Sequence, residues 1–135
     1  MADIKTRVIA EVIGSPEAHV NTVMQSLVEK MGTRKEITIT KKEIFKAKKM
    51  EKQPLWSTFT EAEISFRDIQ ALLNFCFDFM PSSVEILSPE SLACKQKELS
   101  DFVNDLIGRL HQYDMILKNI HAENVVLKRK LGDKA

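Results

Sequence analysis

Residues 99–131 read LSDFVNDLIGRLHQYDMILKNIHAENVVLKRKL, and this stretch decides the architecture of the C-terminal third of the chain. Alternating steps of four and three residues along it meet an apolar side chain at every position but one. These positions, called the seam below, are Leu99, Val103, Leu106, Leu110, Tyr113, Leu117, Ile120, Asn124, Leu127 and Leu131. A repeat of 3.5 residues predicts a left-handed coiled coil, with Val103 at an a position and Leu99 at a d position.

Asn124 is the polar exception in the seam. A single Asn at an a position costs stability but favours a parallel two-stranded register, because the two amides can pair. In a parallel pair this frame sets Arg109 against Asp114 and Glu123 against Lys128, and both pairs have opposite charge. The sequence therefore predicts a parallel homodimer.

The segment IHAENVVLK, residues 120–128, resembles the end of a leucine zipper, in which Leu-x-x-Glu-Asn-x-x-Leu is common. The likeness covers this tail alone and includes no basic DNA-binding region. A helix of about forty residues is roughly 60 Å long, because each residue adds about 1.5 Å. That length exceeds a head of about ninety residues, so we expect a second chain to bury the distal part of the seam.

The residues before this helix alternate between strand and helix patterns. A Val- and Ile-rich strand at 7–13 is followed by GSPE at 14–17, which opens a helix that Gly32 ends. Residues 35–66 read as a long hairpin with its tip near 48–54. Ser65 and Asp68 form a capping box before a second helix, a short strand follows at 83–87, and SPE at 88–90 opens the long helix.

The order of these elements predicts an α+β fold. Strand, helix, strand, strand, helix, strand is the ferredoxin-like βαββαβ arrangement. We predict such a head over residues 1–88, a long helix over 89–135, and a coiled coil from about 99 to 131. Ligand-sensing domains of the ACT type and RNA-recognition domains share this order. The Gly- and aromatic-rich third strand of RNA-recognition domains is absent, because residues 55–63 read LWSTFTEAE.

Composition and charge exclude several classes of protein. The chain has 20 Lys and Arg against 19 Asp and Glu, a net charge of +1, so no overall attraction to nucleic acid or anionic lipid is expected. The charged residues 1–7 lack the apolar core of a signal peptide, and no run reaches transmembrane length. Cys76 and Cys94 are too few for a disulfide framework. We expect a cytoplasmic protein without membrane contact.

Four carboxylates are predicted to share the sheet face that the helices leave uncovered, because side chains alternate along a strand. They are Glu11, Glu61, Glu63 and Glu85. Such a face could bind a hard cation, a basic peptide or the lysines of a partner. The alternative is an ordinary solvated face, which antiparallel sheets commonly have.

The predicted hairpin carries a second candidate site, which is basic. Its residues are Arg34, Lys35, Lys41, Lys42, Lys46, Lys48 and Lys49. They could bind nucleic acid or an acidic partner. The alternative is that lysines protect an edge strand from aberrant pairing.

No catalytic, metal or cofactor site is predicted. The histidines His19, His111 and His121 have no metal-ligand spacing to cysteines or acids, and the chain has no Gly-rich phosphate loop or nucleophile elbow. We therefore predict a non-enzymatic homodimeric interaction or scaffold protein that binds itself and another protein. A ligand-sensing ACT-like module and a nucleic-acid-binding protein are the alternatives.

Overall fold

The computed structural model describes residues 3–133, and it describes side chains as far as Gly132. The elements, in chain order, are β1 (Ile4–Gly14), α1 (Glu17–Gly32), β2 (Ile37–Ile44), β3 (Lys48–Lys49), β4 (Trp56–Phe66), α2 (Ile69–Phe79), β5 (Ser83–Ser88) and α3 (Gln96–Asp133). The predicted α+β class is confirmed. The chain divides into a head that ends at Leu92 and a C-terminal unit that begins at Ala93 and contains α3.

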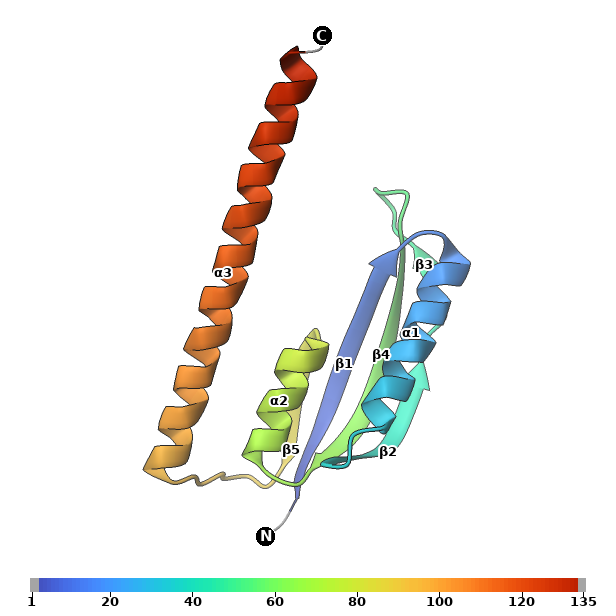
Figure 1. Ribbon diagram of the computed structural model, residues 1–135. Helices are drawn as coiled ribbons and strands as arrows, with labels where there is room; N and C mark the ends of the chain where they lie inside the picture. The colour runs from blue at the N-terminus through green and yellow to red at the C-terminus, as the bar shows by residue number, and fades with distance from the viewer. Residues whose placement is uncertain (1–2, 134–135) are drawn as a thin grey trace. The chain divides into compact units, whose positions relative to one another are not determined.

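The head is built on a five-stranded antiparallel sheet of order β2-β4-β1-β5, with β3 also paired to β4 (Figure 1). The two long central strands pair from Ile4 opposite Phe66 to Gly14 opposite Trp56. Directly opposed residues of β1 and β4 therefore point their side chains to the same face of the sheet, and the face alternates along each strand. Both α1 and α2 cover the same face (Figure 1).

The core lies between that face and the two helices. Its buried residues are Ile4, Val8, Ala10, Met31, Ala62, Ile64, Phe66, Ala71, Leu72 and Phe75. The ring of Phe75 meets the ring of Phe66 edge to face, with centroids 5.2 Å apart. Ile86 points to the same face at the margin of the sheet but is 44% exposed, so it adds little to the core.

Helix α2 begins at a single capping residue. The Asp68 carboxylate accepts a hydrogen bond from the Ala71 backbone N–H at 2.8 Å. Ser65, the predicted partner of Asp68 in a capping box, instead lies in β4 and is buried there. The prediction of a capping box was wrong because β4 extends to Phe66, so the strand holds Ser65 in an extended conformation. At the other end of α2, Met80 adopts the left-handed conformation with φ of 47°.

The predicted hairpin contains a bulge and a second short strand. The register of β2 against β4 shifts between Ile39 and Lys41. The extra residue, Thr40, donates a hydrogen bond from its hydroxyl to the Glu63 carbonyl at 3.1 Å. β3 then pairs with the start of β4, and the backbone N–H of Met50 donates to the Leu55 carbonyl at 2.8 Å to close the tip.

Helix α3 begins at Gln96, later than the predicted start at Pro89. The backbone N–H of Leu99 donates to the Lys95 carbonyl at 3.1 Å in its first turn. Residues 89–95 carry cap-like residues but no part of the seam, which starts at Leu99. Apolar periodicity therefore locates the helix better than the Ser-Pro-Glu signal does. None of the described helices combines the length and hydropathy needed to span a bilayer.

Candidate interaction surfaces

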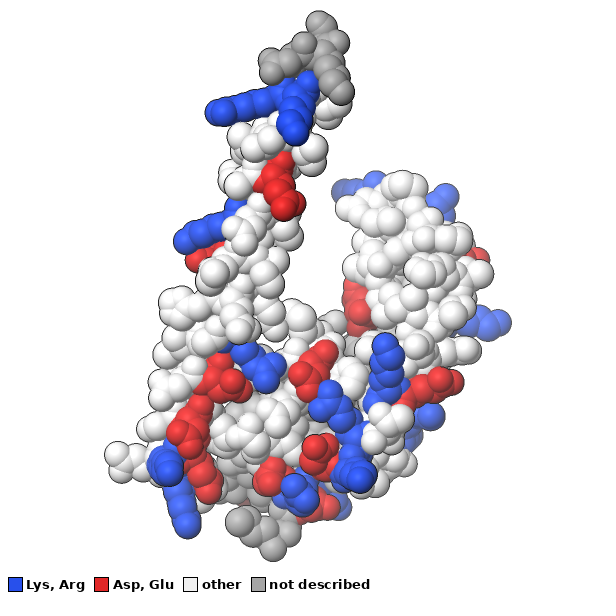
Figure 2. Space-filling view, viewed as in Figure 1, with Lys and Arg blue, Asp and Glu red and all other residues white. Residues whose placement is uncertain are grey.

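The seam lies entirely on α3, and its apolar side chains are exposed. Leu117 is 65% exposed and Leu127 is 57% exposed. In Figure 2 charged side chains lie over the N-terminal part of α3, an uncharged stretch follows, and basic side chains gather near its C-terminal end. A line of exposed leucines, isoleucines and valines of this length is rare on a surface that stays in water.

Charged side chains flanking the seam pair within the helix. The Arg109 guanidinium lies 3.5 Å from the Asp105 carboxylate, and the Lys118 amine lies 2.9 Å from the Asp114 carboxylate. Arg109 and Asp114 are the residues that the heptad frame places opposite each other in a parallel pair. In the single chain both side chains are paired along their own helix, with Asp105 and Lys118.

The uncovered face of the sheet, called the open face, carries the four predicted carboxylates. Pairing across the central strands sets Arg7 opposite Glu63 and Ile9 opposite Glu61, and β5 adds Glu85 opposite Arg7. Glu11 follows two positions after Ile9 and therefore shares this face. The structure thus brings the predicted acidic residues onto one surface.

Arg7 changes the character of the open face. Its guanidinium lies 3.3 Å from the Glu61 carboxylate and 3.0 Å from the Glu85 carboxylate. Lys41 stands opposite Glu63 on the other side of β4. Sequence reasoning selected the acids and missed Arg7, although the same alternation places Arg7 two positions before Ile9. Lys41, Glu63, Arg7 and Glu85 thus form a row of alternating charges across the sheet, and beside that row Glu43 stands directly opposite Glu61.

The far end of the open face is apolar, which the sequence analysis did not anticipate. Phe59 lies opposite Glu11, with Ile13 diagonal to it on β1. The backbone N–H of Phe45 donates to the Phe59 carbonyl at 2.9 Å. This hydrogen bond places Phe45, which directly follows β2, beside Phe59. All three of these apolar side chains are more than one-third exposed. The signal was available, because Phe59 and Ile13 have the same strand parity as the predicted acids.

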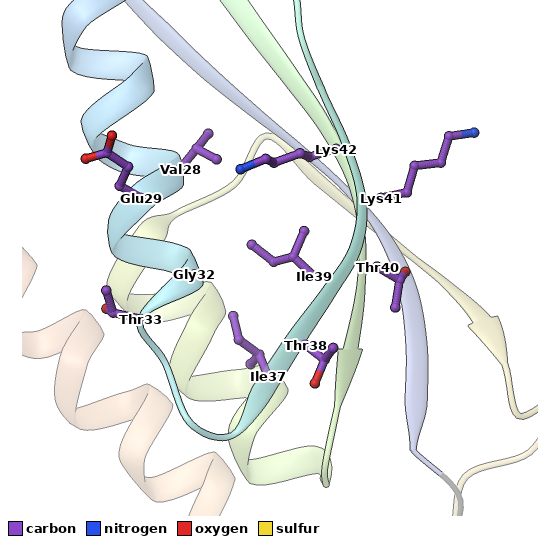
Figure 3. Close-up of a pocket in the computed structure, with 10 residues that line it drawn as sticks. All are labelled: Val28, Glu29, Gly32, Thr33, Ile37, Thr38, Ile39, Thr40, Lys41 and Lys42. Atoms are coloured by element: carbon purple, nitrogen blue, oxygen red, sulfur yellow. The ribbon is translucent and has the colours of Figure 1, made fainter.

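The seven predicted basic residues do not form one surface. Lys41 is opposite Glu63 on the open face, whereas Lys42 is opposite Ala62 on the helix side. Figure 3 shows Lys41 and Lys42 pointing to opposite sides of β2. Arg34 is engaged in the head, because its guanidinium lies 2.6 Å from the Asp78 carboxylate and 5.0 Å from the centre of the Phe79 ring. The remaining lysines, Lys35, Lys46, Lys48 and Lys49, are exposed.

A groove, called the edge groove, runs between α1 and β2 at one edge of the sheet (Figure 3). It encloses about 670 Å³. Ile37, Ile39 and Lys42 point from β2 toward α1, whose wall includes Val28 and Glu29 (Figure 3). The groove is open along the free edge of β2, so its shape suits an extended chain better than an enclosed small molecule.

Reactive side chains are few in the described residues. Partial burial raises the pKa of the Cys76 thiol through desolvation, which disfavours the thiolate, and Cys94 is exposed. Between residues 3 and 133, no group of three His, Cys, Asp or Glu residues is arranged to hold a metal ion. The geometry of the described chain therefore directs attention to surfaces for binding.

Comparison with known proteins matches the chain to a protein family. The model of the MJ0538 family matches residues 5–133, which include both the head and α3. No curated protein and no solved structure matches the chain significantly. The name of the family describes no activity, so function must be argued from the surfaces described above.

Proposed function

We propose that this chain, which belongs to the MJ0538 family, is a non-enzymatic interaction or scaffold protein that dimerises through a parallel coiled coil of α3. The observation that supports the proposal is the exposed seam, in which Leu110, Leu117 and Leu127 are each more than half exposed. A second α3 would cover all of them at once. Burial of apolar surface contributes roughly 25 cal/mol for each Å², so a seam of this length can supply the stability that a dimer needs.

The parallel orientation is supported by the side chains in and beside the seam. Two Asn124 amides can pair across a parallel dimer, whereas a shifted register would bury each amide against leucine. Arg109 would exchange its intrahelical partner for Asp114 of the second helix. Exposed ion pairs contribute at most about 1 kcal/mol, so such pairs select orientation more than they stabilise the dimer.

The heads are proposed to act as paired binding surfaces. Their sheet order and their strand and helix order fit the ferredoxin-like arrangement, and each head has an open face that neither α1 nor α2 covers. Two heads joined by one coiled coil would bind a partner protein with avidity, because the second contact forms at high effective concentration. The free thiols of Cys76 and Cys94 support a location in a reducing cytoplasm.

Light scattering on the full chain at micromolar concentration tests the proposal. We expect a dimer for the natural sequence and monomers for Leu117→Asp or Leu127→Asp, because a buried unpaired charge opposes association by several kcal/mol. Asn119→Asp and Ala122→Asp, which place the same charge off the seam of the same helix, should remain dimers. Asn124→Leu should stay associated but lose its single oligomeric state. A monomeric natural chain would contradict the proposal.

A ligand-sensing module of the ACT type is the second candidate. The order β2-β4-β1-β5 supports it, because ACT-type domains share the same succession of elements. A thermal-shift screen of amino acids, nucleotides and divalent cations tests it. A stabilising ligand that leaves the dimer mass unchanged would favour this candidate, and the absence of any shift would count against it.

A further inference from the structure

The outer edge of β2 is an unpaired strand edge. β2 ends the sheet order and pairs with β4 on one side, and no described strand pairs with its other side. A free edge of eight residues offers backbone N–H and C=O groups to another strand. The edge groove lies directly beside it, with Ile37 and Ile39 on the groove side (Figure 3).

The bulge at Thr40 gives β2 an unusual symmetry. Before the bulge, Ile37 and Ile39 point to the helix side, since they stand opposite Phe66 and Ile64. After the bulge, Lys42 and Ile44 point to that side, since they stand opposite Ala62 and Thr60. These four positions are symmetric about the point between Thr40 and Lys41. In a regular strand of eight residues they could not be, because alternation would put residues 37 and 44 on opposite faces.

We infer that β2 pairs with β2 of the second copy that the α3 coiled coil holds nearby, antiparallel and about a two-fold axis between Thr40 and Lys41. This inference rests on the proposed dimer, because the edge contact alone does not hold two separate chains together. Each residue then meets a residue of the second copy on the same face of the sheet. The opposed pairs are Ile37 with Ile44, Thr38 with Glu43, Ile39 with Lys42, and Thr40 with Lys41. One continuous sheet runs through both heads, and both copies use the same surface.

The side chains of β2 are complementary in this register. Ile44 is 41% exposed in the single chain, and Ile37 of the second copy covers it. Lys42 of the second copy enters the edge groove, where the α1 wall carries Glu29. In each half of the contact, Ile37 packs against Ile44, and Lys42 lies near the carboxylate of Glu29. The two-fold axis repeats both contacts.

The two lysines of β2 select this register. Lysines on an edge strand normally prevent aberrant pairing. A register centred on Lys42 would set the two Lys42 side chains directly against each other, which is destabilising. The register centred between Thr40 and Lys41 sets no lysine directly opposite a lysine and uses the whole strand, although the two Lys41 residues become diagonal neighbours across the axis. Lys41 and Lys42 thus oppose other registers of the β2–β2 pair and permit this register.

Disulfide cross-linking of the full chain tests the pairing. Thr38→Cys with Glu43→Cys, on a Cys94→Ser background, places two thiols on directly opposed positions of the two copies. Within one chain the two positions are roughly 17 Å apart at about 3.3 Å per residue, far beyond the Cα separation of about 7 Å that a disulfide tolerates. We expect mild oxidation to convert most of the protein into a covalent dimer.

The controls define the register. Each single cysteine variant should give at least tenfold less covalent dimer, because neither Thr38 nor Glu43 meets its own copy across the two-fold axis. Adding Lys42→Glu to the cross-linking pair should lower the yield severalfold, and adding Glu29→Lys as well should restore it. A yield no higher than that of the single variants, or one that Lys42→Glu leaves unchanged, would overturn the proposal.

Hydrogen exchange on the unsubstituted chain gives a second reading that needs no variant. The two edges of the same sheet serve as test and control. Outward-facing amides of β2 should exchange at least tenfold more slowly than those on the outer edge of β5, because a second copy protects only β2. Equal exchange at the two edges would leave β2 open to a strand of another protein and would contradict the pairing proposed here.

Discussion

The head buries its large apolar side chains in a core, whereas α3 leaves its apolar side chains exposed. The head closes a core in which Phe66 is 0% exposed and Phe75 is 2% exposed. In α3 no described residue is buried, and only Phe102, Arg109 and Val125 are even partly covered. The difference teaches that the head buries its apolar side chains against its own elements, whereas the apolar seam of α3 is exposed.

This contrast has an energetic consequence. Helical stability in proteins comes chiefly from tertiary packing of an apolar face, and an isolated helix in water is marginal. The head should therefore unfold as an autonomous unit. The stability of α3 should depend on whatever covers its seam. The three changes below separate the two regions, from the largest expected effect to the smallest.

Phe75→Ala should have the largest effect. It removes a buried ring that packs against Phe66, so the free energy of unfolding of the head should fall by about 3–5 kcal/mol. The single tryptophan, Trp56 in β4, reports this transition in urea through its fluorescence. Met115→Ala is the matched change on α3, where the side chain is 64% exposed, and it should leave the Trp56 transition in place. If Phe75→Ala and Met115→Ala shifted the Trp56 transition equally, the proposed difference between the head and α3 would be wrong.

Gly108→Ala should stabilise α3 by about 1 kcal/mol in each chain, because glycine is a poor helix former. A β-carbon at this position would meet no atom within 4 Å, so the gain is not offset by a clash. Helix content followed by circular dichroism should melt at a higher temperature. The Trp56 transition should not move. A lower melting temperature would mean that position 108 is covered by a partner at close range.

Arg7→Gln should have the smallest effect, below about 1 kcal/mol, because its two ion pairs are exposed. The loss should shrink further as salt is added, since salt screens exposed charges. Urea denaturation at low and high ionic strength measures both quantities. Lys5→Gln, on the same strand face but without such a pair among the described contacts, is the control. A loss of several kcal/mol would show that Arg7 organises the open face.

Much of the head could be predicted from local patterns. Alternation along the strands correctly placed Glu11, Glu61, Glu63 and Glu85 on the open face. Both helices of the head lie where their apolar spacing put them. The errors fell at boundaries, where Ser65 was assigned to a cap and Pro89 to a helix start. A cap residue and a strand end compete for the same few positions, and pairing with β1 on one side and β2 on the other keeps Ser65 in β4.

The candidate surfaces were predicted less evenly. The seam residues share α3 as predicted, because the spacing of side chains around a helix depends on the chain alone. The basic residues were grouped by their closeness in sequence, but consecutive residues of a strand point to opposite faces, so Lys41 and Lys42 lie on opposite sides of β2. Arg34 was expected to be a partner site and pairs with Asp78, which lies 44 residues away along the chain.

The sequence by itself determined the periodic features of this protein. They are the repeat of 3.5 residues in the seam and the two-residue alternation of β1 and β4, because both are properties of spacing along one element. Tertiary structure alone decided the neutralisation of the open face by Arg7, the bulge opposite Glu63 and the symmetry of the β2 edge. Each of these depends on residues that are distant in sequence and meet only when the strands pair.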